Sequence, residues 1–140
     1  MKKIILLYVI FIMLQLSCET DHDRINIIPD GTYIGTFQRQ LAFGGGDTAH
    51  VTITFSSNIY TGQSDRFHYP ALCHGTYKIE NNKIVFANEC VWTAEFDWSL
   101  ILSGEYDFSI KGNRLTIYHD YSGPTIDAYK DNYLLTGQVP

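Results

Sequence analysis

The stretch from Cys73 to Cys90 constrains this chain more than any other, because apolar and polar residues alternate on both sides of Asn81-Asn82. Asparagine tolerates the positive φ that a two-residue type I′ turn requires, so this pair predicts the turn of a β-hairpin. Once the turn is placed there, the residue opposite each strand position is fixed. The expected cross-strand pairs are Ile79 with Ile84, Tyr77 with Phe86, and Cys73 with Cys90.

The two cysteines at the open end of this hairpin are expected to form a disulfide. They fall on a non-hydrogen-bonded pair, where Cα atoms lie about 4.5 Å apart, near the short end of disulfide geometry. Closing a loop of this size contributes about 3 kcal/mol on a chain-entropy estimate. A slip of one residue would break both the cysteine pair and the apolar face, so the register is well specified. That face contains Tyr77, Ile79, Ile84 and Phe86.

Residues 1–17 have the pattern of an export signal. Lys2 and Lys3 provide the positive start, and an apolar run follows from Ile4 to Leu14. A run of about eleven residues suits a signal peptide and is too short to cross a bilayer.

The segment Leu14-Gln15-Leu16-Ser17-Cys18 resembles the lipobox of bacterial lipoproteins. The resemblance implies that Cys18 becomes the lipid-modified first residue of the mature chain, which is then anchored to the outer membrane of the cell envelope. The alternative is ordinary secretion, with Cys18 merely near the cleavage site. The cysteine count favours the anchor, because Cys73 and Cys90 pair in an oxidising compartment and acylation removes the third thiol.

Residues 18–29 are expected to form a polar tether that leads into one domain over residues 30–140. The acidic start of the tether, residues 19–24, resembles the export signal of surface-exposed lipoproteins in some Gram-negative bacteria. A solvated linker that only holds the domain away from the membrane explains the same composition. The sequence leaves both interpretations open.

The charge balance argues against a nucleic-acid partner. The formal net charge is −5, and the loss of Lys2 and Lys3 with the leader changes it to −7. No basic stripe remains to follow a phosphate backbone or an anionic membrane surface. After residue 28 no segment has a helical period of useful length, so the composition is that of an all-β domain.

Short alternating runs predict eight strands joined mostly by tight turns. Turns at Ser57-Asn58 and Gly112-Asn113 set two further hairpins, the sixth strand is expected over residues 99–110, and the last over about 125–135. Such an up-and-down meander closes into a single antiparallel β-barrel, which removes exposed strand edges. The expected pairs are Phe55 with Tyr60, Ile53 with Gly62, Ile110 with Leu115, Phe108 with Ile117, and Tyr106 with His119.

Four glycines fall on the presumed inner face of different strands. Glycines inside strands weaken a flat sheet, but they permit the sharp coiling that barrel closure needs. We also expect them to leave room inside the barrel. They are Gly35, Gly62, Gly75 and Gly104.

Three features beyond the lipobox point to a family: the opening strand Gly31-Thr32-Tyr33-Ile34-Gly35-Thr36-Phe37, the meander, and the segment from Trp92 to Trp98. With them the chain resembles the lipocalin-like lipoproteins of the calycin group, although lipocalins have Gly-x-Trp where Gly31-Thr32-Tyr33 stands here. The preferred interpretation is a non-catalytic protein that binds a small apolar or amphipathic molecule in the barrel interior or mouth. The expected lining residues are Tyr33, Phe55, Tyr106, Phe108 and His119.

An alternative surface site combines Trp92 and Trp98 with the carboxylates of Glu95 and Asp97. Aromatic faces beside carboxylates suit the stacking of a carbohydrate or contact with a protein on the cell surface. The same aromatic residues would serve equally as a plug that closes the barrel, since aromatic side chains bury much area. The plug, a purely structural role, is the favoured of the two interpretations.

The sequence offers no basis for an enzyme. Glu95 and Asp97 would share one face of a strand, and neighbours on one strand cannot straddle a glycosidic bond. No Ser/His/Asp order, phosphate-binding glycine loop or cysteine nucleophile is present. The five histidines lack the converging spacing of a metal site, and His119 is expected to be a core imidazole beside Tyr106. No cofactor is expected.

The lipid anchor predicts the outcome of fatty-acid labelling. Cys18→Ser should leave the domain folded and abolish incorporation of a radiolabelled fatty acid, because the lipid is attached through the cysteine sulfur. Cys73→Ala serves as the control and should keep the label. Labelling that persists in the Cys18→Ser protein would refute the anchor.

Overall fold

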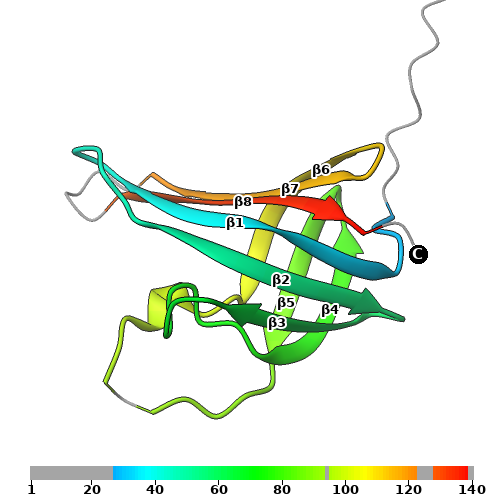
Figure 1. The fold of residues 1–140 in the computed structure, drawn as a ribbon, viewed down its shortest axis with the longest axis horizontal. Helices are drawn as coiled ribbons and strands as arrows, with labels where there is room; N and C mark the ends of the chain where they lie inside the picture. Colours follow the sequence, from blue (N-terminus) through cyan, green and yellow to red (C-terminus); the bar gives the residue numbers. More distant parts are fainter. Residues whose placement is uncertain (1–26, 94, 123–127, 139–140) are drawn as a thin grey trace, which may run out of the picture.

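The computed structural model describes residues 27–93, 95–122 and 128–138, which form a closed antiparallel barrel (Figure 1). Each strand pairs with its neighbours in the sequence, and the last strand returns to the first. The strands are β1 (Gly31–Leu41), β2 (Thr48–Ser56), β3 (Ile59–Ser64), β4 (His74–Glu80), β5 (Lys83–Asn88), β6 (Gly104–Lys111), β7 (Arg114–Tyr121) and β8 (Tyr129–Gly137). Within the described ranges, no helix is long and apolar enough to cross a membrane.

Tight turns fix the register of three hairpins as the sequence predicts. Asn81 and Asn82 have φ values of 51° and 62°, and Ser57 and Asn58 have 49° and 69°, as type I′ turns require. The pairs Tyr77 with Phe86, Phe55 with Tyr60, Ile53 with Gly62, and Ile110 with Leu115 are confirmed.

The barrel has two different ends. The three tight turns lie at one end, together with the start of the described chain at Ile27 and its last described residue, Gln138; we call this the turn end. Longer connections gather at the other end, the loop end, where Figure 1 shows the segment between β5 and β6 extending outward. The two ends therefore differ in structure.

The core is rich in aromatic side chains that pack edge to face. Ring centroids lie 5.0 Å apart between Phe55 and Tyr77, 5.1 Å between Tyr60 and Phe86, and 5.7 Å between Phe86 and Tyr106. At the turn end, Ile28 enters the core with a relative exposure of only 2%. Interlocking rings of this kind fill the interior and also contribute beyond their buried area.

The expectation that four inner-face glycines leave room inside is wrong. A Cβ at Gly35 would overlap the carbonyl oxygen of Leu134, and one at Gly75 would overlap that of Ala87. At Gly62 the side chain of Leu72 already fills the space, and Gly104 is exposed, with a φ of 92°. Three of these glycines therefore allow close approach of neighbouring atoms, and none of the four opens a cavity.

The sixth strand begins later than expected. Residues 98–100 form a 3₁₀ turn, η1 (Trp98–Leu100), and β6 starts only at Gly104. Leu102 is buried as predicted, but it lies in the connection rather than in a strand. Apolar and polar residues do alternate over 99–110. The first part of this run, however, is an irregular segment that packs against the connection between β3 and β4. The final strand, whose register the sequence left open, pairs Phe37 with Tyr133.

The disulfide between Cys73 and Cys90 is present. Its Cα–Cα distance is 6.4 Å, so the expected separation of about 4.5 Å is wrong. The reason is that β4 begins at His74 and β5 ends at Asn88, so the cysteines lie just beyond the ladder. The bridge therefore joins the two loop-end connections that leave this hairpin.

Cys73→Ala should lower the free energy of unfolding by about 2–4 kcal/mol, because the cross-link no longer restricts the unfolded chain. The double variant Cys73→Ala/Cys90→Ala should cost little more, since either change already removes the bridge. Urea unfolding under non-reducing conditions measures both. The prediction fails if a thiol assay on the non-reduced protein finds both cysteines free.

Candidate ligand-binding site

A buried arginine organises the loop end. Arg39 lies near the end of β1, where its side chain points inward, and it is almost fully buried beside Asp131 of β8. The Nε and Nη2 groups of Arg39 donate to the two carboxylate oxygens of Asp131, both at 2.7 Å. This bidentate geometry is the strongest that an arginine makes with a carboxylate.

The remaining donors of Arg39 reach the connection between β5 and β6. Nη1 donates to Ser99 Oγ at 2.7 Å and to Asp97 Oδ2 at 3.2 Å, and Nη2 donates to the Ser99 carbonyl at 2.9 Å. The guanidinium carbon also lies 3.9 Å from the centroid of the Tyr129 ring. All five N–H bonds are used, so Arg39 has a positioning role and no donor left for a ligand.

Asp97 holds the loop through hydrogen bonds, although its side chain is 58% exposed. Its Oδ1 accepts from the backbone N–H of Ser99 at 2.9 Å and from Ser99 Oγ at 2.6 Å, which caps η1. Partial burial alone would raise the pKa of Asp97, but the Ser99 hydrogen bonds and the charge of Arg39 outweigh burial and lower it. The carboxylate is thereby kept ionised for its contacts with the 3₁₀ turn.

Two loop-end connections are joined through their backbones. The N–H of Ala71 donates to the carbonyl of Leu100 at 3.0 Å, and that of Leu102 donates to the carbonyl of Ala71 at 3.3 Å. The Tyr60 hydroxyl donates to the carbonyl of Leu102 at 3.0 Å from inside the barrel, and burial raises the pKa of Tyr60 to about 12. Together these bonds close the barrel at this end with ordered backbone.

An aromatic cluster lies on this support, made of side chains from the two joined connections. The imidazole of His68 stands 4.2 Å from the Phe96 ring and 5.5 Å from Trp92, and Phe67 stacks on His68 at 3.7 Å. Phe96 also contacts both tryptophans, with centroid distances of 5.5 and 6.4 Å. The aromatic cluster consists of Phe67, His68, Trp92, Phe96 and Trp98.

Much of the aromatic cluster faces solvent. Phe67 is 89% exposed and Trp98 is 56% exposed, which is unusual for two large aromatic side chains that contact the same cluster. In the described chain, the indole N–H of Trp92 is buried without a hydrogen-bond acceptor. An unpaired buried donor costs about 1–3 kcal/mol, so a group that supplies an acceptor there would be favoured.

A groove of about 400 Å³ runs beside the aromatic cluster, and we call it the loop-end groove. It is lined by residues 62–64, 66–68, 70–73 and Trp92. Arg66 at its edge is held by an ion pair with Asp47 at 2.8 Å. The groove therefore combines aromatic faces with polar groups, as ligand sites commonly do.

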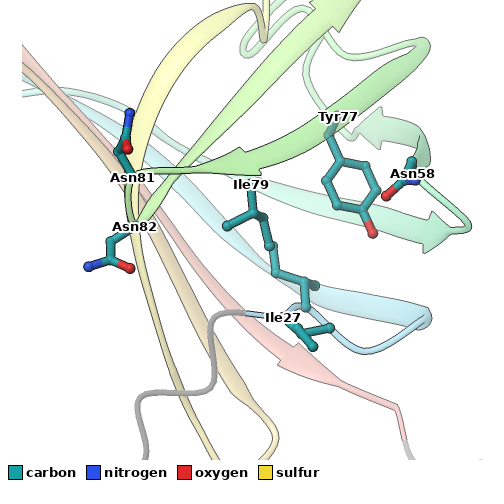
Figure 2. A pocket seen from close by; sticks show the side chains of 7 residues that line it. Ile27, Asn58, Tyr77, Ile79, Asn81 and Asn82 are labelled. Carbon is teal, nitrogen blue, oxygen red and sulfur yellow. The ribbon is translucent and has the colours of Figure 1, made fainter.

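A second pocket, of about 460 Å³, lies at the turn end (Figure 2). Ile27 and Ile79 both line it, with Tyr77 and Asn58 to one side. Its wall consists of two tight turns and the first described residues. It carries no charged group, and it exists because the segment that precedes β1 docks across the barrel.

The five residues expected to line an interior ligand site lie in or against the core. Tyr33, Phe55 and Tyr106 are buried, and burial raises the pKa of the Tyr106 hydroxyl. Phe108 and His119 are half-buried, with His119 at 5.2 Å from the Tyr106 ring as expected. These side chains contact one another or their neighbours, so a ligand inside the barrel stays a prediction.

The four residues of the alternative surface site divide into two groups. Trp92 and Trp98 both join the aromatic cluster, whereas Asp97 turns toward Arg39 and Glu95 is exposed. The expectation that Glu95 and Asp97 share a strand face is wrong, because neither lies in a strand.

The sequence did not reveal Phe67, His68 or the pair Arg39 and Asp131. A signal for the first two was the run Arg66-Phe67-His68-Tyr69, which places three aromatic rings in a loop. A signal for Arg39 was its position two residues after the inward-facing Phe37, since an inward arginine requires a buried partner.

Comparison with known proteins adds no relative: no protein-family model, curated protein or solved structure matches this chain. The class of protein is therefore defined by the fold alone. It is an eight-stranded up-and-down β-barrel, compatible with a lipocalin-like fold.

Arg39→Met should lower the free energy of unfolding by about 3–5 kcal/mol, because it leaves the Asp131 carboxylate buried and unpaired. The matched control is Arg66→Met, which removes an exposed ion pair and should cost less than about 1 kcal/mol. Adding Asp131→Leu to Arg39→Met should recover part of the loss. Equal effects of Arg39→Met and Arg66→Met in denaturant unfolding would contradict this role.

Proposed function

We propose that this chain is a lipid-anchored, non-catalytic binding protein whose ligand docks on the aromatic cluster at the loop end. The observation that carries the proposal is the exposure of Phe67 and Trp98 beside the loop-end groove. Contiguous exposed apolar surface that is rimmed by polar residues is typical of interaction sites and ligand-binding grooves.

A neutral glycan fits this surface best. The apolar faces of pyranose rings stack on aromatic side chains, while Gln63 and Arg66 at the groove supply polar partners for hydroxyl groups. The formal net charge of −5 disfavours acidic glycans and other polyanions. The site is held in place through Arg39, which limits the ordering cost of binding.

The orientation of the barrel supports a lipid anchor on Cys18. The chain enters the barrel at Ile27, at the turn end, and about nine residues separate it from Cys18, a reach of about 30 Å at most. The aromatic cluster lies at the opposite end. An anchored protein would therefore present the cluster away from the outer membrane and toward a glycan or protein partner.

The packing of the interior favours this surface over a ligand enclosed by the barrel. Phe55 has no exposed surface, and Tyr33 and Tyr106 are each 4% exposed. A small apolar or amphipathic ligand would have to displace these rings, whereas the loop-end groove needs no such rearrangement. For a small apolar or amphipathic ligand too, the loop-end groove at the mouth of the barrel is therefore preferred over the barrel interior.

Trp98→Ala should weaken glycan binding about tenfold, which corresponds to the loss of one stacking contact of about 1.4 kcal/mol. The chain contains two tryptophans, and both belong to the aromatic cluster, so intrinsic fluorescence reports on the site directly. A glycan array identifies the probe, and fluorescence titration with that oligosaccharide measures affinity. The matched control is Tyr118→Ala, which removes an exposed aromatic side chain from the barrel wall.

The control should bind as the unaltered protein does. An array without a hit would contradict the glycan proposal. Equal loss of affinity in Trp98→Ala and Tyr118→Ala would place the ligand elsewhere.

A further inference from the structure

The disulfide at the loop end has a histidine against both of its sulfurs. His74 Nδ1 lies 3.3 Å from Cys73 Sγ and 3.1 Å from Cys90 Sγ. The three candidate ligand atoms all lie within 4.8 Å of one another. His74 is exposed and the cysteines are half-buried, so the group can be reached from solvent.

We propose that, once the disulfide is reduced, Cys73, His74 and Cys90 bind one Zn²⁺ ion. A dithiol reductant supplies two electrons and two protons, which cleave the S–S bond to two thiols while the reductant becomes a disulfide. Zn²⁺ then displaces the two thiol protons and takes both thiolates and the neutral imidazole. Two thiolates and one imidazole form a borderline-soft ligand set that suits zinc.

The geometry requires little movement. Zn–S bonds of about 2.3 Å and Zn–N bonds of about 2.0 Å in a tetrahedral site place ligand atoms about 3.5–3.8 Å apart. The nitrogen–sulfur distances of 3.1 and 3.3 Å are already close to this range. Only the two sulfurs must separate, and the 6.4 Å between their Cα atoms leaves room for side-chain rotation.

The backbone supports a thiolate at this position. The N–H of His74 donates to Cys90 Sγ at 3.3 Å, an arrangement that stabilises a negative sulfur. The last backbone bond of the hairpin, from the Glu89 N–H to the His74 carbonyl at 3.1 Å, keeps the ligand-bearing segments together without the disulfide. The fourth coordination position would face solvent. This inference does not depend on the proposed glycan site.

Cobalt(II) tests the site, because tetrahedral thiolate–cobalt complexes absorb strongly. The full chain carrying Cys18→Ser removes the third thiol, and a phosphine keeps the other two reduced. Titration should give thiolate-to-cobalt charge-transfer absorption at one ion per chain, displaced by Zn²⁺. The oxidised chain and Cys73→Ser should give none. His74→Ala should bind at least about tenfold more weakly, and the exposed-histidine control His50→Ala should be unchanged.

Three results would overturn the proposal. One is a reduced, folded chain without thiolate–cobalt absorption, and another is equal affinity in His74→Ala and His50→Ala. The third concerns a chain that unfolds on reduction: Zn²⁺ should then restore its circular-dichroism spectrum, and failure to restore it contradicts the site.

Discussion

The guanidinium of Arg39 is the interaction on which the loop end depends. It uses two donors on Asp131 of β8 and three on Asp97 and Ser99, so one side chain joins the barrel wall to the segment that carries both tryptophans. A buried ion pair of this kind adds little net stability compared with apolar packing. Its main effect is to position the loop, because all five donors of Arg39 reach their acceptors only when the loop lies in this one place.

The barrel thus separates its packed interior from the exposed aromatic surface at the loop end. Its interior is filled by the rings of buried aromatic residues such as Phe55 and Tyr106. This packing makes the barrel a rigid body. The proposed binding function would fall to the loops, where Phe67 and Trp98 are exposed on a hydrogen-bonded backbone. Function placed on loops over a rigid scaffold is a common arrangement, since the scaffold can stay packed while the loops vary.

Much of the fold could be predicted because hairpins are local. The turn residues at Asn81-Asn82 and Ser57-Asn58 set the register of their strands within a few positions, and alternation then assigns each face. The loop end could not be predicted in this way. Contacts such as Arg39 with Asp131 and Ala71 with Leu100 join residues that are far apart in sequence, so no local pattern specifies them. The late start of β6 has the same cause.

Native-state amide hydrogen exchange tests most directly whether the loop end is an ordered support. The amides of Ala71 and Leu102 donate to the carbonyls of Leu100 and Ala71, outside any strand. The account predicts protection within about tenfold of that of the core strand amide of Tyr133, since these bonds should open only with the barrel. Exchange as fast as that of the exposed loop residue Gly45 would contradict it.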